Sequence, residues 1–129
     1  MSTISDIKGV VTVDWDVNTE QIAKVRKNNL LSRFNEYSHN IRLRVKDGEN
    51  WVDPSASSMA ATLFLTSASG ALTTIIGSTE TVTIGSESGK VFTFSLTNAS
   101  LEQGKFRMDI RVEKSTVKRT AVIIEGNVL

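Results

Sequence analysis

The 129-residue chain contains no cysteine, which excludes disulfide cross-links, thiolate nucleophiles and cysteine-bound metal sites. It has a single histidine, so a metal site would have to rest on carboxylates, and no cluster of them appears in the sequence. No apolar run approaches the roughly 18 residues of a membrane-spanning helix. The formal net charge is only +1, which leaves no bulk field to attract nucleic acid or an anionic membrane. We therefore expect neither nucleic acid nor a membrane as a partner.

The rest of the composition is that of one ordinary globular domain. Hydrophobic residues make up 40% of the chain and charged residues 22%, and this length is enough to bury a core. We predict a single domain over residues 1–129, with an N-terminal strand or arm at 1–20 and the core of the fold at 21–129. The opening residues MSTISDIKG lack a basic stretch followed by an apolar one. We expect no signal peptide and synthesis in a cytoplasm.

Alternation of apolar and polar residues dominates the sequence. In residues 9–17, for example, Val13 and Trp15 share one face and Asp14 and Asp16 the other. Residues 58–67, SMAATLFLTS, are apolar on both faces, which predicts a central strand. Similar segments follow at 40–46, 71–77, 80–85, 90–96, 105–114 and 119–126, separated by Gly- and Ser-containing turns. This pattern is typical of an antiparallel sandwich or barrel.

Two stretches need a more specific interpretation. Residues 18–34 could begin a helix with Asn18 or Thr19 as cap, but their apolar spacing fits the helical period poorly. We favour extended segments with a turn at Asn28-Asn29, and a helix is the alternative. Residues 88–115 are predicted to form a β-hairpin. The side chains of this hairpin that we expect in the core are Phe92, Phe94, Phe106, Met108, Ile110 and Val112.

Three short motifs suggest chemistry but fit a structural role better. Asp14, Asp16 and Asn18 have the spacing that opens a calcium loop, yet Thr19 and Val25 stand where that loop needs Gly and Glu. The same aspartates lack the burial that a glycosidase acid and base require. Residues 85–90, GSESGK, are too short for a phosphate-binding loop and precede a strand, so we predict a hairpin turn.

No catalytic set is apparent either. His39 has no neighbouring nucleophile in a pattern such as G-x-S-x-G, and we interpret it as a solvated loop residue. Arg42, Arg44 and Lys46 form a basic row on one strand, without interleaved aromatics. A second row, at 105–111, is interrupted by acidic residues, so nucleic-acid binding is not favoured. We predict no enzyme activity, no metal and no cofactor.

The order of several of these features resembles a known family. A polar Val-Arg start, a Ser-Arg pair, a strand that closes on Asp-Gly with an aromatic residue beyond, and a terminal Gly-Lys-Val segment occur in this order. The residues concerned are Val25-Arg26, Ser32-Arg33, Asp47-Gly48, Trp51, Asp53, Gly70, Gly89-Lys90-Val91, Phe92, Phe94, Gly104 and Phe106. Residues 21–129 are in this respect similar to the N-terminal domain of the upper baseplate proteins of tailed bacteriophages. They differ in about eight inserted residues at 34–41 and in the strand that precedes the motif.

The resemblance implies an all-β, immunoglobulin-like antiparallel β-sandwich, of about 7–9 strands by the count of alternating segments. It also implies a non-enzymatic structural protein of a virion, in a baseplate, tail or head-decoration position. The expected partners are other phage virion proteins, and we expect a homo-oligomer, either a trimer or a hexamer.

The residues that we predict to contact a partner are Val128, Leu129, Arg42, Arg44 and Trp51. The apolar C-terminal strand could instead complete the protein's own sheet. The alternative function is a carbohydrate- or receptor-binding module, with a host-surface glycan as ligand. Such a module would present exposed aromatic residues, for which the candidates are Trp15, Tyr37 and Trp51.

Overall fold

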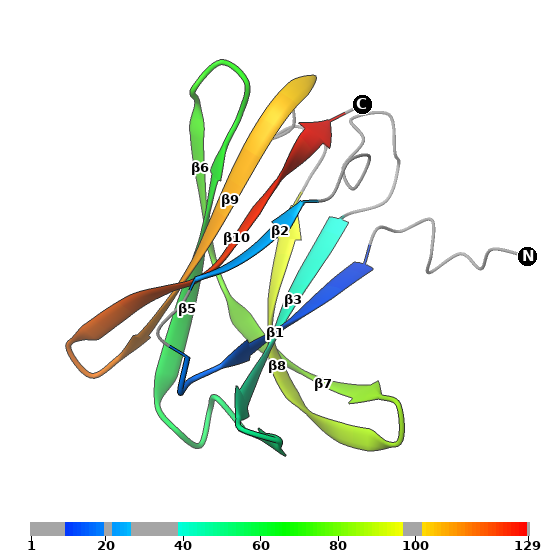
Figure 1. Cartoon of the computed structure of the whole chain (residues 1–129), viewed down its shortest axis with the longest axis vertical. Helices are drawn as coiled ribbons and strands as arrows, with labels where there is room; N and C mark the ends of the chain where they lie inside the picture. The colour runs from blue at the N-terminus through cyan, green and yellow to red at the C-terminus, as the bar shows by residue number, and fades with distance from the viewer. Residues whose placement is uncertain (1–9, 20–21, 27–38, 97–101, 129) are drawn as a thin grey trace, which may run out of the picture.

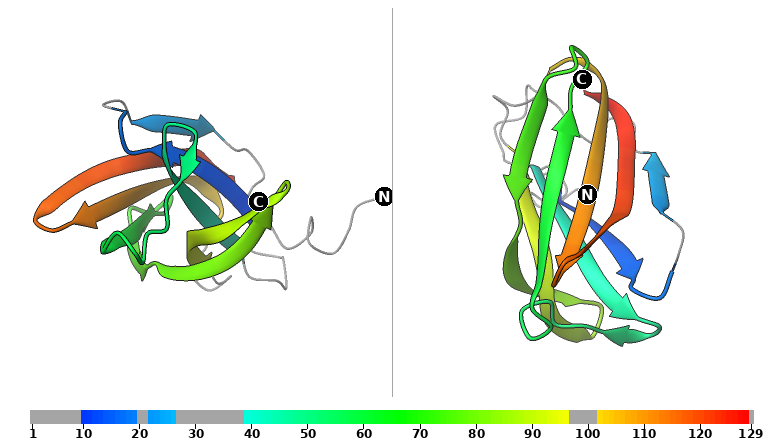
Figure 2. Two further views of the ribbon diagram at one scale, coloured as in Figure 1. Left: turned by 90° about the horizontal axis from the view of Figure 1, so that it is seen from below. Right: turned by 90° about the vertical axis from the view of Figure 1, so that its left-hand side faces the viewer.

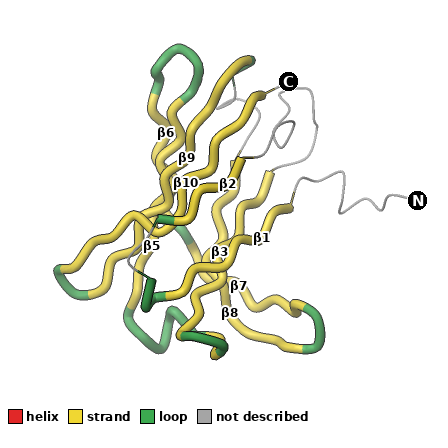
Figure 3. The backbone as a smooth tube through the Cα atoms, in the orientation of Figure 1, coloured by secondary structure: helices red, strands yellow, loops and turns green. Residues whose placement is uncertain are grey.

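The computed structural model describes residues 10–19, 22–26, 39–96 and 102–128, which form ten strands in two sheets (Figures 1 and 3). Sheet A has the order β1 (Val10–Asp16), β3 (His39–Asp47), β8 (Glu87–Leu96) and β7 (Ser78–Ile84), and the two-residue β4 (Asn50–Trp51) pairs with β3. Sheet B has the order β2 (Ala23–Arg26), β10 (Val117–Val128), β9 (Gly104–Lys114), β5 (Met59–Thr66) and β6 (Leu72–Ile76). The predicted all-β sandwich is confirmed, with ten strands where about 7–9 were expected.

The two sheets lie face to face (Figure 2). The core lies between them and comes from the alternation of apolar and polar residues in the sequence. Every second residue of β9 is buried, and the outward residues between them are polar. The core side chains of sheet A are Trp15, Ile41, Leu43, Val45, Phe92, Phe94 and Leu96. Those of sheet B include Ala61, Leu63, Leu65, Phe106, Met108, Ile110, Val112, Val122, Ile124 and Val128. The six core residues that we predicted for residues 88–115 are therefore all confirmed.

The hairpin predicted over residues 88–115 is wrong. Its two strands lie in different sheets, because β8 pairs with β3 and β7 while β9 pairs with β10 and β5. Seven residues separate β8 from β9, and at about 3.3 Å per residue they are long enough to cross the roughly 10 Å between packed sheets. Both strands still direct their aromatic residues into one core. Two strands joined as a hairpin in one sheet and two strands that cross from one sheet to the other therefore show the same alternation in the sequence.

In the described chain the hairpins are β3–β4, β5–β6, β7–β8 and β9–β10. The β7–β8 turn consists of Gly85 and Ser86, which confirms the prediction of a turn for GSESGK. Gly85 has φ +63, a conformation that a glycine adopts without steric cost. In β10 a register shift between Thr120 and Val122 marks a bulge. Four consecutive residues from Ala121 are buried there, which a regular alternating strand does not allow.

Two pairs of strands are parallel, a feature that the sequence analysis did not predict. β1 pairs with β3 in sheet A, and β2 pairs with β10 in sheet B. Parallel neighbours need a long connection, and here the chain passes through β2 of sheet B between β1 and β3. Residues 23–26 are extended, as predicted, whereas the turn predicted at Asn28-Asn29 lies outside the described residues.

β5 lies between β9 and β6, so the prediction of a central strand for residues 58–67 is also confirmed. Over the residues that the structure describes, no helix is long and apolar enough to cross a membrane.

Candidate functional site

Three of the predicted contact residues lie on the outer face of sheet A. Arg44 stands directly opposite Asp14 in the parallel β1–β3 pair, and its guanidinium binds that carboxylate with two hydrogen bonds. Arg44 Nε donates to Asp14 Oδ1 at 2.7 Å, and Nη2 donates to Oδ2 at 2.6 Å. This two-point geometry matches the guanidinium fork to the carboxylate and orients both side chains.

These hydrogen bonds also shift the pKa of both groups in the direction that favours their charged forms. The bonds from Arg44 lower the pKa of Asp14 below its ordinary value, against a smaller opposing effect of burial. The same bonds raise the pKa of Arg44. Because Arg44 is hydrogen-bonded at two points to Asp14, the negative charge of Asp14 largely balances the positive charge of Arg44 within the chain.

Trp51 is held on the same face by three contacts. Its indole Nε1 donates to the carbonyl oxygen of Lys90 at 2.9 Å. The guanidinium carbon of Arg44 lies 5.2 Å from the centre of its ring, at cation–π distance. A Cβ built on Gly89 would meet the ring at 2.6 Å, so only glycine leaves room for the indole. Trp51 therefore fastens β4 to β8 and is only half-exposed.

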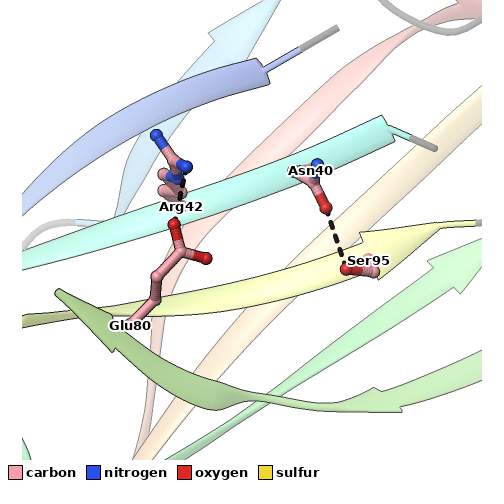
Figure 4. A network of polar contacts seen from close by, with 4 residues as sticks. All are labelled: Asn40, Arg42, Glu80 and Ser95. Atoms are coloured by element: carbon pink, nitrogen blue, oxygen red, sulfur yellow. Dashed lines mark hydrogen bonds and ion pairs between the residues drawn. The ribbon is translucent and has the colours of Figure 1, made fainter. Parts of the chain in front are cut away.

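Arg42 pairs with Glu80, which reaches it from β7 across β8 (Figure 4). Its Nη2 lies 2.7 Å from Glu80 Oε1, and Asn40 accepts a hydrogen bond from Ser95 nearby. Figure 4 shows that both contacts are made from β3, by Arg42 and Asn40. The buried Arg42 Nε has no hydrogen-bond partner among the described residues. The basic row of β3 is thus largely paired within the sheet.

The second basic row, on β9, has internal partners as well. Arg107 Nε donates to Asp109 Oδ1 at 2.8 Å. The guanidinium carbon of Arg111 lies 4.6 Å from the centre of the Phe64 ring. Both contacts lie on the outer face of sheet B, where acidic side chains stand among the basic ones.

Of the three residues with calcium-like spacing, Asp14, Asp16 and Asn18, the last two form hydrogen bonds that stabilise the turn after β1. Asp16 Oδ1 accepts the backbone N–H of Asn18 at 2.9 Å and that of Gly48 at 3.4 Å, and these bonds lower the pKa of Asp16. Asn18 Nδ2 donates to Asp47 Oδ1 at 2.6 Å. The motif therefore joins the ends of β1 and β3. No group of three or more acidic, histidine or cysteine side chains with the geometry of a metal site occurs in the described part of the chain.

The C-terminal residues predicted to contact a partner are placed differently. Val128 is 4% exposed and pairs with Gly104, so its side chain belongs to the protein's own core. The last strand completes the protein's own sheet, which was the alternative left open by the sequence. Leu129 lies outside the described residues.

Of the aromatic residues considered for a glycan platform, the two that the structure describes, Trp15 and Trp51, do not form a shared exposed surface. Trp15 is 6% exposed and belongs to the core. Trp51 is half-covered by the contacts described above, and Tyr37 lies outside the described residues, as does the side chain of His39. An open hollow of about 410 Å³ does lie beside Trp51, lined by Asp53, Thr81, Ser88 and Lys90 among others.

One exposed feature was missed in the sequence analysis: strand β6. It is an edge strand of sheet B, and in the described chain it pairs only with β5. Ile76 is 81% exposed and Leu72 62% exposed, and both lie on the outer face of the sheet. The sequence of β6, LTTII, contains no charged residue and no proline. This absence of charge is the signal by which the sequence could have identified it.

Comparison with known proteins returned no matching family model and no matching curated protein. Among solved structures, the N-terminal domain of phage TP901-1 ORF48 aligns with a TM-score of 0.47 and 9% identity, over 92% of this chain and 98% of that one. The cysteine protease inhibitor EhICP2 from Entamoeba histolytica aligns with a TM-score of 0.41 and 14% identity, over 93% and 97%. With TM-scores below 0.5, neither likeness carries an argument about function.

Proposed function

We propose that this chain is a non-enzymatic structural protein of a bacteriophage virion that works by docking onto other virion proteins. The position would be that of a baseplate or tail attachment subunit, or of a head decoration protein. The proposal combines the order of sequence features that resembles a baseplate domain with one structural observation, the open and uncharged edge strand β6.

The β6 edge is unusual because edge strands are normally protected against pairing. Natural sheets place charged residues, bulges or proline on their edges, since unpaired backbone groups recruit other strands. The three strands at the other ends of the described sheets follow that rule: β1 carries Asp14 and Asp16, β2 carries Lys24, and β7 carries Glu80. β6 carries no charge and exposes Leu72 and Ile76. An edge of this kind suits a protein that is covered by a neighbour in an assembly.

Several of the described residues that carry the family resemblance have structural roles in the sandwich. Gly89 makes room for Trp51, Phe94 is fully buried, and Gly48 and Gly104 have positive φ. They account for a shared architecture rather than for a shared docking surface. The surface that docks is therefore better sought among exposed residues that the motif does not include, and β6 is such a segment.

Quantitative mass spectrometry of purified virions from the phage that carries the gene tests this proposal. The chain should be present in many copies per particle. Replacement of the gene by one encoding Ile76→Lys should lower its incorporation, whereas Ser86→Lys, in the exposed turn of the other sheet, should leave it unchanged. Both substitutions are at exposed positions, so both proteins should fold. A chain absent from washed particles would refute the proposed function.

A further inference from the structure

The backbone of β6 has a defined open side. Gly77 donates its N–H to the carbonyl oxygen of Ala61 at 2.9 Å, which makes Ala61 and Gly77 a hydrogen-bonded pair of the antiparallel β5–β6 ladder. Hydrogen-bonded pairs alternate along such a ladder. Ile75 and Thr73 therefore bond toward β5, and the N–H and C=O groups of the residues between them point away from it. These outward residues are Leu72, Thr74 and Ile76.

The same three residues also expose their side chains. Leu72, Thr74 and Ile76 are exposed, whereas Thr73 and Ile75 are half-buried, and Ile75 packs against the core. Each outward backbone group thus belongs to a residue whose side chain lies on the outer face. The views in Figures 1 and 2 place β6 at the border of the sandwich, with no described strand beyond it.

The strand is complementary to itself. A two-fold axis normal to the sheet, placed beside Thr74 on the side away from β5, would set a second β6 antiparallel to the first. In this register Leu72 faces Ile76 of the second copy, and Thr74 faces Thr74 of the second copy. The backbone N–H and C=O groups of all these residues point away from β5, toward the second copy, so each facing pair can exchange backbone hydrogen bonds. Apolar and Thr–Thr pairs are among the favourable cross-strand neighbours, and no like charges oppose each other.

We infer that the occupant of the β6 edge is a second copy of this chain, joined through a two-fold antiparallel β6–β6 pair centred on Thr74. This inference rests on the proposed docking role of the edge and names its partner. Sheet B then continues from one protomer into the next. A hexamer with dihedral symmetry contains two-fold contacts of this kind, whereas a cyclic trimer contains none.

A pair of five-residue strands buries little area, so we expect weak, concentration-dependent association. A cysteine trap detects such association. Because the chain has no cysteine, every disulfide of a Thr74→Cys variant joins position 74 to position 74. Facing Cα atoms of a hydrogen-bonded pair are about 5.5 Å apart, which is within disulfide range. Oxidation should give covalent dimers roughly tenfold or more faster than for Ser86→Cys, because pairing raises the effective concentration of the thiols.

Opposite charges at the two-fold axis test the register. Thr74→Lys and Thr74→Glu should each remain monomeric at 14.1 kDa in light scattering, since like charges would then face each other. Mixed in equal amounts, the two variants should associate again. Equal cross-linking of the Thr74→Cys and Ser86→Cys variants, or no association in the mixture, would overturn the self-pairing. Because these assays use the purified chain, that result is separate from its presence in virions, which tests the proposed function.

Discussion

The indole of Trp51 occupies the space in which a side chain at Gly89 would begin. A Cβ on Gly89 would lie 2.6 Å from Cε2 of Trp51 and 2.9 Å from Cδ2. The two residues come from β4 and β8, and the hydrogen bond from Trp51 to the Lys90 carbonyl fixes the ring beside that strand. The absence of a side chain at Gly89 on β8 leaves the space that the large Trp51 ring from β4 fills, although the two residues lie far apart in the sequence.

Gly89→Ala should destabilise the protein through this contact. The ring cannot move without losing its bond to Lys90, so we expect a loss of about 1–3 kcal/mol, as for overpacking. Urea unfolding followed by tryptophan fluorescence measures it. Lys90→Ala is the matched control, because it keeps the carbonyl and removes only an exposed side chain. Equal stability of Gly89→Ala and the wild type would mean that Trp51 is free to move.

Phe94→Ala should be far more costly than Phe64→Ala. Phe94 is fully buried between the sheets, and its removal should cost about 3–5 kcal/mol. Phe64 is half-buried on the outer face of sheet B, where it contacts Arg111, and its loss should cost only about 1 kcal/mol, as for a cation–π contact near the surface. The comparison by urea unfolding uses the same substitution on both faces. Similar losses would contradict the assignment of faces.

The Asp14–Arg44 pair should make stability depend on pH in the acid range. The pKa of Asp14 is lower in the folded protein than its ordinary value of 3.8. Its contribution is therefore complete above pH 3.8 and is lost as the pH falls through the lowered folded value. Asp14→Asn should cost about 0.5–1 kcal/mol at neutral pH, since the pair is partly exposed.

The difference in unfolding free energy between Asp14→Asn and the wild type should shrink as the pH drops below 3.8. Urea titrations at several pH values measure this difference. Glu49→Gln, in the exposed turn after β3, is the control. A difference that stays constant down to the lowest pH would show that the carboxylate charge of Asp14 does not contribute.

Arg119 should stabilise the segment that follows β1, residues 17–19, by hydrogen bonds to its backbone. Its guanidinium donates to the carbonyl oxygens of Val17 and Thr19, about 100 residues earlier in the chain. Arg119→Ala removes both bonds, each worth about 1 kcal/mol. The amides of Val17 and Thr19 should then exchange several-fold faster by NMR-detected hydrogen exchange. Lys118→Ala removes a neighbouring exposed cation and should leave these amides unchanged.

Part of the candidate site could be predicted from the sequence. The alternation of Arg42 and Arg44 with apolar residues correctly placed both on an outer face. It did not show that Asp14 and Glu80 pair with them, because these partners lie on strands 30 and 38 residues away. Trp51 was chosen for its aromatic ring, and only the structure shows that Gly89 and Arg44 half-cover it.

The sequence by itself determined most of the strands and, where they alternate regularly, which of their faces is buried. Alternation is a local property, so Phe92 and Phe106 were assigned to the core even though their strands were wrongly paired. The tertiary structure decided which strands are neighbours, because pairing depends on the direction in which each connection leaves its sheet. It therefore decided that β8 and β9 separate into two sheets, and that the uncharged β6 lies at an open edge. Whether a strand lies at an edge depends on which strands pair with it, so its own sequence does not determine this.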